Sequence, residues 1–504
     1  MNANFYAVLQ RCFPASPDAP LLTTDTGERY TYGDLERETA RLARFLVSLG
    51  LKPGDRVAAQ IEKSPQALFL YLATLRAGLV FLPLNTAYQQ GEIGYFLGDA
   101  EPGVMVCRPE AEGWIAPLAK QAGTAHLLTL DEHGRGSFSD AAAGCDADFG
   151  VAESAEPDLA ALIYTSGTTG RSKGAMLSHG NISSNGLTLR TYWRFSAEDV
   201  LIHALPMFHV HGLFVALSTV LGSGAQLLFH RRFDAAAVLA DLARATVLMG
   251  VPTFYTRLLQ EPGLTSEACR GMRLFVAGSA PLLAETHRDW QRRTGHAILE
   301  RYGMSEAGMI TSNPYDGERR AGTVGFPLPG VSLRVAGDDD RPLPDGEVGS
   351  IQIKGPNVFQ GYWRMPEKTA EEFTADGWFR TGDVGRVGAD GYVAIVGRAK
   401  DLVITGGYNV YPKEIELAID ELPGVQESAV IGVPHPDFGE AVTAVVVRDG
   451  SGAALTEEEV IRRIKARLAG YKVPKRVHFV EQLPRNTMGK VQKNILRERF
   501  SNAP

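Results

Sequence analysis

A short loop dense in small and hydroxyl-bearing residues constrains this chain more than any other feature of its sequence. The loop reads Tyr164-Thr-Ser-Gly-Thr-Thr-Gly-Arg-Ser-Lys-Gly-Ala and follows an apolar segment, Leu159–Ile163, that is typical of a buried strand. Small residues let backbone N–H groups approach a polyphosphate, hydroxyls add further donors, and Lys173 adds positive charge. The segment therefore predicts a phosphate-binding loop at the end of a strand.

Two better-known loops do not fit this segment. A Walker A loop needs a Ser or Thr directly after its Lys, where this chain has Gly174. The run Gly170–Gly174 matches the GxSxG elbow of hydrolases, but its Ser lies inside the hydroxyl-rich loop and no HGGG-type oxyanion loop is evident. The predicted phosphate ligands are Thr165, Ser166, Gly167, Thr168, Thr169, Gly170 and Lys173.

Length and charge limit the class of protein. The chain has 504 residues, and single cores stop growing at about 250–300 residues, so at least two domains are expected. The formal net charge of −7 provides no overall basic field for nucleic acid. The four cysteines are far apart and form no CxxC pair, which argues against a zinc site and favours a reducing, cytoplasmic location.

Membrane insertion and secretion are not expected. The segment 212–229 carries no charge, but it contains three Gly and several polar residues, so a buried helix–turn–strand is the better interpretation. Residues 1–14 show no basic stretch followed by an apolar core, so we expect no signal peptide.

The pattern of predicted secondary structure changes twice along the chain. Strand–helix alternation up to about Gly330 predicts an α/β fold with parallel-rich sheets flanked by helices. Short alternating strands separated by turns then predict a β-rich subdomain over about 331–397. A compact α+β pattern follows. We therefore expect an N-terminal domain over 1–398 and a small C-terminal domain over 399–504.

Seven segments in a fixed order carry a resemblance to a known family. Besides the loop, they are Phe208-His-Val-His-Gly212, Ala277-Gly-Ser-Ala-Pro281, Tyr302-Gly-Met-Ser-Glu306, Thr381-Gly-Asp383, Gly397-Arg-Ala-Lys-Asp401 and Pro484-Arg-Asn-Thr-Met-Gly-Lys490. Together they resemble the acyl-adenylate-forming superfamily of acyl-CoA synthetases, luciferases and peptide-synthetase adenylation domains. The resemblance implies that the β-rich subdomain is a distorted barrel and that the C-terminal domain is a mobile lid.

The resemblance also implies a nucleotide site. Asp383 matches the ribose ligand, and a carboxylate accepts well from a diol. Glu306, with Thr165, matches the Mg²⁺ site, and Mg²⁺ prefers oxygen ligands and bridges phosphates. Ser305 replaces the more usual Thr but retains the hydroxyl. The other implied nucleotide contacts are Gly278, Ser279, Ala280, Tyr302, Gly303, Met304 and Arg398.

Lys490 matches the catalytic lysine of the family. When a carboxylate attacks the α-phosphorus of ATP, negative charge accumulates, and an ammonium group can bridge acid and phosphate. Reversible acetylation by an acetyltransferase and a deacetylase would remove that charge. The family's lid rotation implies a hinge at Lys400, and Gly406 with Gly407 would let the pantetheine arm of coenzyme A pass close to the backbone.

Within the superfamily, the sequence most resembles malonyl-CoA synthetases. Malonate has a second carboxylate that needs a cation, and Arg288 matches the expected arginine. His209 is expected to donate a hydrogen bond to the substrate carboxylate. Val210 and Met309 are expected to shape the space around C2, where Val210 departs from a Thr often found in relatives.

The expected reaction joins malonate to CoA with ATP and Mg²⁺, releasing AMP and pyrophosphate, in a monomer or weak homodimer. Three alternatives stay open. One is a ligase for methylmalonate or for another short or aryl acid. Another is a stand-alone adenylation domain that loads a carrier protein. The third is a non-enzymatic protein that only binds nucleotide, which the combination of the loop, Glu306, Asp383 and Lys490 disfavours.

Overall fold

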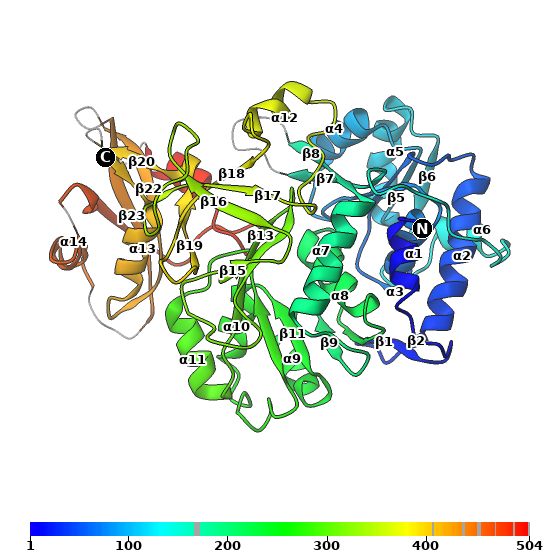
Figure 1. The fold of residues 1–504 in the computed structure, drawn as a ribbon, viewed down its shortest axis with the longest axis horizontal. Coiled ribbons are helices and arrows are strands. Elements are labelled where there is room, and N and C mark those ends of the chain that lie inside the picture. Colours follow the sequence, from blue (N-terminus) through cyan, green and yellow to red (C-terminus); the bar gives the residue numbers. More distant parts are fainter. Residues whose placement is uncertain are drawn as a thin grey trace.

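The structure is a computed structural model of the 504-residue chain. It describes residues 1–165, 172–405, 408–435, 439–450, 455–468, 470–486 and 489–501. The N-terminal helix lies within the larger lobe, at the right in Figure 1, and the last strands and helices form the smaller lobe at the left.

One sheet of the larger lobe has six strands in the order β6-β5-β3-β4-β7-β8. All its neighbours are parallel except β7 and β8. Two of its parallel strands, β4 and β5, are buried at every position, as expected for a parallel sheet covered on both faces. The strands are β3 (Arg56–Gln60), β4 (Val80–Pro83), β5 (Val104–Cys107), β6 (His126–Thr129), β7 (Leu159–Thr165) and β8 (Lys173–Ser178).

A second sheet has nine strands in the order β15-β14-β13-β12-β11-β9-β10-β1-β2. Its middle strands are parallel, and antiparallel strands close both edges. The strands are β1 (Pro20–Thr24), β2 (Arg29–Thr31), β9 (Val200–His203), β10 (Gln226–Phe229), β11 (Val247–Gly250), β12 (Leu274–Ala277), β13 (Leu299–Met304), β14 (Gly308–Ser312) and β15 (Phe326–Pro327).

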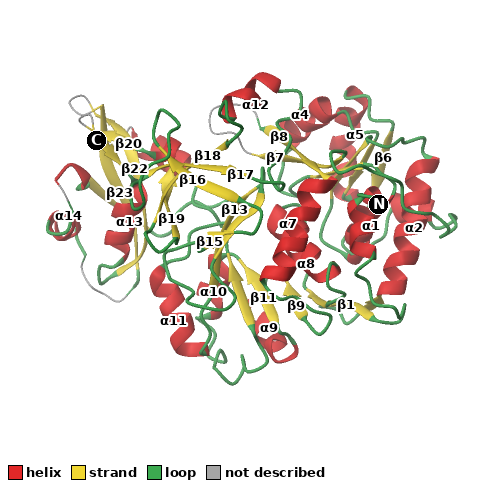
Figure 2. Cartoon of the chain, in the orientation of Figure 1, coloured by secondary structure: helices red, strands yellow, loops and turns green. Residues whose placement is uncertain are grey.

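The remaining two sheets lie later in the chain. A four-stranded antiparallel sheet contains β16 (Ser332–Ala336), β17 (Gly349–Lys354), β18 (Phe379–Val387) and β19 (Val393–Arg398). A five-stranded sheet contains β20 (Val403–Thr405), β21 (Tyr408–Val410), β22 (Val425–His435), β23 (Gly439–Arg448) and β24 (Arg476–Val480). Figure 2 shows these strands in yellow between the larger lobe and the C-terminus.

Helices surround the sheets, and several have clear start signals. The Thr31 and Asp34 side chains form a capping box on α2, and Ser64 caps α3 just before a Pro at its first turn. The helices are α1 (Phe5–Gln10), α2 (Tyr32–Ser48), α3 (Pro65–Arg76), α4 (Gln90–Ala100), η1 (Pro109–Ala111), α5 (Glu112–Gln121), α6 (Ser137–Ala142), α7 (His179–Tyr192), η2 (His211–Ala216), α8 (Leu217–Leu221), α9 (Ala235–Asp241), η3 (Leu242–Arg244), α10 (Pro252–Leu258), α11 (Ala284–Thr294), α12 (Pro366–Glu372), η4 (Ala399–Asp401), α13 (Pro412–Asp420), α14 (Glu457–Lys465), η5 (Gly470–Lys472) and α15 (Lys493–Ser501).

Separate hydrophobic clusters stabilise the two lobes. One large cluster runs through the six- and nine-stranded sheets and includes Trp193 and Trp290, both fully buried. Other clusters lie between the five-stranded sheet and its helices. Helix α7 contacts β8 of one large sheet and β14 of the other, which joins the two sheets. The predicted α/β fold with a small α+β C-terminal part is confirmed, and the boundary at 398/399 stays a prediction.

The charge-free segment 212–229 forms η2, α8 and β10, as the sequence analysis predicted. Within the described part of the chain, no helix combines the length and the apolar character needed to cross a bilayer.

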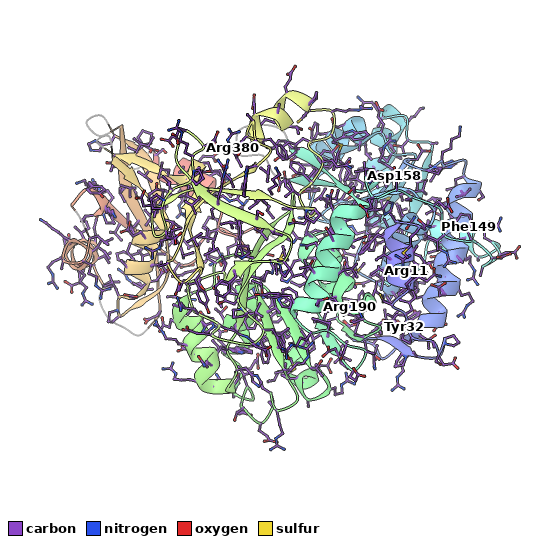
Figure 3. All side chains as sticks on the ribbon, in the orientation of Figure 1. Arg11, Tyr32, Phe149, Asp158, Arg190 and Arg380 are labelled. Atoms are coloured by element: carbon purple, nitrogen blue, oxygen red, sulfur yellow. The ribbon has the colours of Figure 1, made fainter. Side chains whose placement is uncertain are left out.

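Among the described residues, salt bridges on the surface tie individual strands and loops together within each lobe. Arg380, labelled in Figure 3, lies on β18 and pairs with Asp340 at 2.5 Å. Both side chains are about one-third exposed, and exposed pairs of this kind stabilise a fold by at most about 1 kcal/mol. The fold therefore depends mainly on its buried sheets.

Candidate active site

The first group of predicted residues lies where two neighbouring strands of the nine-stranded sheet meet. Strand β12 ends at Ala277, and its neighbour β13 contains Arg301 and Tyr302. Gly278 follows β12 directly, and a Cβ added to it would lie 2.4 Å from Cζ of Arg301. A larger residue at this position would therefore require the guanidinium to shift.

Ser279 continues this turn in an unusual backbone conformation. Its φ is +71°, a left-handed value that a residue with a side chain adopts at an energetic cost. The conformation brings the Ser279 hydroxyl to 3.3 Å from Nδ1 of His211. Ala280 follows and is partly exposed. A strained turn held in place by sheet neighbours is a frequent feature of functional sites.

Three of the predicted nucleotide residues form one hydrogen-bonded group, which we call the Asp383 cluster: Tyr302, Asp383 and Arg398. The Tyr302 hydroxyl donates to Oδ2 of Asp383 at 2.5 Å, and Nε of Arg398 lies 3.1 Å from Oδ1. Asp383 and Arg398 are also direct partners across β18 and β19. Burial, followed by the charge of Asp383, holds the pKa of Tyr302 well above its usual range, so the phenol stays a donor.

A second group joins Lys173 to Glu306 through an aromatic ring. Nζ of Lys173 lies 4.0 Å from the centroid of the Tyr362 ring, and the Tyr362 hydroxyl donates to Oε1 of Glu306 at 3.2 Å. Lys173 also pairs with Glu372 at 3.3 Å. Tyr362 thus holds the predicted phosphate-binding lysine beside the predicted metal ligand.

The residues present fit a single divalent cation bound mainly through Glu306. This carboxylate is 7% exposed, and its pKa is raised above the usual range by burial, which a cation would reverse. No group of three or more His, Cys, Asp or Glu side chains among the described residues is arranged to hold a metal.

Part of the predicted phosphate loop lies outside the described residues: Ser166, Gly167, Thr168, Thr169 and Gly170. Its two ends are described, because Thr165 closes β7 and Lys173 opens β8 as direct cross-strand partners. Gly303, Met304 and Ser305 lie partly buried at the end of β13 and in the turn that leads to Glu306.

Two histidines at the start of a π-helix, His209 and His211, lie where the carboxylic acid substrate is expected to bind. We call this part of the site the acid end. Nδ1 of His209 accepts a hydrogen bond from the backbone N–H of His211 at 3.3 Å, which leaves Nε2 to carry the proton. Burial, followed by the charge of Arg301, lowers the pKa of His209 to about 4. His209 is therefore a neutral hydrogen-bond donor near pH 7. A π-helical turn such as η2 is rare and is frequently found at functional sites.

Val210 and Met309 are both buried, with exposed fractions of 3% and 2%. Asn185 on α7 fixes the backbone of Met309, accepting from its N–H at 3.0 Å and donating to its carbonyl at 2.8 Å. A Cβ added to Gly303 would lie 2.5 Å from Cε of Met309. The Met309 side chain is thus held against the strand that carries the nucleotide residues.

Arg288 occupies a different position from the other predicted residues. It lies on α11, and its side chain is exposed. Its positive charge is felt at His287, the preceding residue. The structure therefore places Arg288 on the surface of a helix rather than among the buried groups around His209.

Lys490 lies on the small lobe but faces the residues of the large one. Desolvation, followed by the charge of Arg398, lowers the pKa of Lys490 to about 8, and Lys490 in turn contributes to the lowered pKa of His209. Its backbone N–H donates to Oδ1 of Asn486 at 2.9 Å, which closes the loop. A Cβ added to Gly489 would lie 3.2 Å from Oγ1 of Thr253 on the large lobe.

The predicted hinge Lys400 lies in η4, directly after the Asp383 cluster. The neighbouring Asp401 pairs with Arg497 of α15 at 2.8 Å, so the small lobe is attached on one side of this turn. Gly406 and Gly407, the predicted coenzyme A channel, lie outside the described residues.

Sequence reasoning missed three residues that the structure places in the site. They are Tyr362, His211 and Arg301. Tyr362 had no local signal. His211 was quoted within a motif, but its contact with Ser279 depends on tertiary structure. Arg301 offered a signal that went unused, because an adjacent acid and base, Glu300 and Arg301, interrupt an apolar strand.

Comparisons with known proteins agree over almost the whole chain. A family model described as AMP-binding enzyme matches residues 9–363, and one described as AMP-binding enzyme C-terminal domain matches residues 414–490. A curated feruloyl-CoA synthase from Amycolatopsis sp is 38% identical, covering 94% of each chain. A malonate–CoA ligase from Arabidopsis thaliana is 34% identical, covering 94% of this chain and 85% of the relative.

A solved structure of ATP-bound MatB from Rhodopseudomonas palustris is 58% identical, with a TM-score of 0.97, and the match covers 100% of this chain and 99% of the other. The apo form of the same protein, with the same identity and coverage, gives a TM-score of 0.87. The arrangement described above therefore resembles the ATP-bound form more closely than the apo form.

Proposed function

We propose, from the premise that this chain belongs to the AMP-binding, adenylate-forming enzyme family, that it is a malonate–CoA ligase. The coarser activity follows from membership: the chain is an AMP-forming acid–CoA ligase that uses ATP, Mg²⁺ and coenzyme A. The choice of malonate is the proposal. Its main support is the acid end of the site, where a neutral donor, His209, lies within the field of a buried cation, Arg301.

In the proposed first half-reaction, a carboxylate oxygen of the acid attacks the α-phosphorus of ATP. An O–P bond forms and the bond to pyrophosphate breaks, which gives an acyl-adenylate. Nε2–H of His209 orients the attacking carboxylate, and Lys490 offsets the negative charge that develops between acid and phosphate. Bound Mg²⁺ would be held by Glu306 and would neutralise charge on the phosphates.

The Asp383 cluster would position the nucleotide for this step. A ribose diol offers two donors to the Asp383 carboxylate, where Tyr302 and Arg398 already fix the oxygens. In the proposed second half-reaction, the thiol sulfur of coenzyme A attacks the acyl carbonyl and AMP leaves. The small lobe must reorient to admit the thiol, and the proposed hinge is Lys400.

An AMP-release assay with ATP, Mg²⁺ and coenzyme A tests this function. We expect the highest kcat/KM with malonate, when it is compared with methylmalonate, acetate, benzoate, ferulate and octanoate. A clear preference for any uncharged-tail acid would overturn the malonate assignment while leaving the ligase intact.

The second candidate acid is ferulate, because a feruloyl-CoA synthase is 38% identical to this chain and the malonate–CoA ligase 34%. An aromatic acid would leave the positive charge of Arg301 without a partner, which disfavours this candidate. The same assay separates the two acids.

A further inference from the structure

Lys63 is a buried lysine in the loop between β3 of the six-stranded sheet and α3. The residue is 7% exposed, and burial lowers the pKa of its ammonium group well below the usual range. Asp25, the acid whose charge acts on Lys63, is already paired with Arg231 at 3.4 Å. Burying an amine is costly, so proteins rarely retain a lysine at such a position without a use.

The main partner of Lys63 is a histidine of the other large sheet. Nζ of Lys63 lies 2.5 Å from Nδ1 of His203 and donates to the backbone carbonyl of the same residue at 2.7 Å. It also lies 4.4 Å from the centroid of the Phe229 ring, where a cation is attracted to the aromatic face. His203 ends β9 and is 1% exposed, so this buried contact joins the six-stranded sheet to the nine-stranded one.

These contacts select one protonation state of the His203 ring. Nε2 lies 2.9 Å from the carbonyl oxygen of Gly212, and a carbonyl can only accept, so Nε2 carries a proton. Burial, followed by the charge of Lys63, lowers the pKa of His203 well below its usual range, so the ring is neutral. Nδ1 therefore has no proton and accepts from the Lys63 amine. Lys63 thereby fixes the tautomer in which His203 donates to Gly212.

Gly212 lies in the π-helical turn η2 at the acid end of the site. The backbone N–H of the next residue, Leu213, donates to the His209 carbonyl at 2.9 Å, so the same turn holds His209. Gly212 packs closely against the loop before it, since an added Cβ would lie 2.2 Å from the carbonyl oxygen of Pro206. The bond from the His203 ring therefore anchors the turn on which the position of His209 depends.

We propose that Lys63 is a positioning residue for adenylate formation, which acts through His203 on the π-helical turn that holds His209. The contacts run from the Lys63 amine to the His203 ring, and from that ring to the backbone of η2. Without the amine, Nδ1 of His203 can carry the proton, and Nε2 then has no hydrogen to donate to Gly212. His209 would lose part of the support that orients its Nε2–H. This inference rests on the role that the proposed function gives to His209, whichever acid the enzyme prefers.

Lys63→Met tests the proposal, because Met is a long, unbranched side chain without an amine. Acid-dependent exchange of pyrophosphate into ATP, with the acid that the AMP-release assay favours, measures adenylation. We expect kcat/KM for the acid to fall about 10- to 100-fold, partly through a higher KM, because a small misplacement of an orienting group costs about that much. KM for ATP should stay nearly constant. A smaller fraction of folded enzyme would instead lower kcat alone, which separates the proposed role from a loss of stability.

A double-mutant cycle tests whether the effect passes through His203. In His203→Gln the new amide always carries N–H donors, so it needs no neighbouring amine to place its proton. We expect Lys63→Met to lower kcat/KM by less than about threefold when it is added to His203→Gln. Losses that multiply in the double variant would overturn the inference.

Arg76→Met is the matched control, because Arg76 is another buried cation at an end of α3. It is also 7% exposed, but it donates to the Phe149 carbonyl at 3.0 Å and pairs with Glu36 at 3.3 Å. Its removal should lower the Tm, since these buried bonds are lost, and should leave KM for the acid and for ATP unchanged.

Nitrogen NMR of histidine-labelled protein reads the tautomer of His203 directly. The signals of this ring are assigned by their absence in His203→Gln. In wild type we expect a proton on Nε2 and none on Nδ1, and in folded Lys63→Met a mixture of both neutral tautomers. A proton that stays on Nε2 in Lys63→Met would overturn the inference, whatever the kinetics of that variant.

His209→Phe separates this inference from the proposed function, because Phe has no N–H to orient the acid. A fall in kcat/KM for the acid in His209→Phe, with unchanged kinetics in Lys63→Met, would overturn the inference and leave the proposed function standing. Unchanged kinetics in His209→Phe would overturn the role proposed for His209, and the inference with it.

Discussion

The nucleotide end and the acid end of this site differ in whether their buried polar groups already have partners within the protein. At the nucleotide end, the members of the Asp383 cluster bond to one another, and the Tyr362 ring joins Lys173 to Glu306. At the acid end, Arg301 and His211 keep buried nitrogens without described partners. One end is satisfied before any ligand arrives, and the other is completed only by a ligand.

This difference has a physical consequence for recognition. Groups that already have partners lose little when a ligand is absent, so the nucleotide end is held rigidly in place. Groups without partners discriminate strongly, because a ligand that fails to satisfy them leaves buried donors unpaired. We therefore expect the nucleotide end to set position and the acid end to set specificity.

The largest expected effect comes from removing Lys490, a cation of the small lobe that lies close to both ends. Lys490→Ala should slow adenylate formation by about 10³-fold, as expected when a group that stabilises developing charge is lost. Malonate-dependent exchange of pyrophosphate into ATP measures this step. Transfer of a preformed malonyl-adenylate to coenzyme A should be nearly unchanged, and an equal loss in both steps would contradict the proposed role.

Asp383→Asn tests whether the nucleotide end depends on its internal bonds. The change keeps the shape but weakens the bonds from Tyr302 and Arg398, and bonds to charged groups contribute about 1.5–3 kcal/mol each. We expect KM for ATP to rise about 10- to 100-fold with KM for malonate nearly constant. An equal rise in KM for ATP and in KM for malonate would show that the nucleotide end and the acid end do not bind their ligands independently.

The pH profile of adenylation gives an intermediate effect. The pKa of Lys490 is lowered to about 8, so the ammonium is present below that pH and is lost above it. The pKa of His209 is about 4, so this histidine stays neutral above about pH 5. We expect a plateau between about pH 5 and 8 and a fall of about tenfold per unit above it. Lys490→Arg should extend any remaining activity to higher pH. If the fall in activity at high pH occurs at the same pH in this variant, the titration of another group causes it.

The smallest expected effect concerns the wall of the acid end. In Gly278→Ala the new Cβ would crowd the Arg301 guanidinium, and overpacking of a buried site costs about 1–3 kcal/mol. Denaturant unfolding measures the loss. Gly98→Ala is the control, since nothing lies within 4 Å of a Cβ there and alanine favours its helix. Equal stability of the two variants would show that Arg301 can move aside.

Much of the fold could be predicted because the signals are local. Apolar runs such as Leu159–Ile163 and turn residues between short strands indicate sheets wherever they occur, and these segments form β7 and the four-stranded sheet. The order of the strands within each sheet could not be predicted. Strand β1, for example, lies between β2 and β10, and β10 comes more than two hundred residues after β1 in the chain. Such pairing depends on long-range packing.

The sequence by itself determined the family, the cofactors and the residue types of the nucleotide end, because these are carried by motifs whose members are close in the chain. Tertiary structure alone decided which charges keep partners. Tyr362 reaches Glu306 across 56 residues, and Arg301 is isolated by the strands around it rather than by its neighbours in sequence. Desolvation is a property of the folded surroundings, so whether a charge is satisfied can be known only once those surroundings are in place.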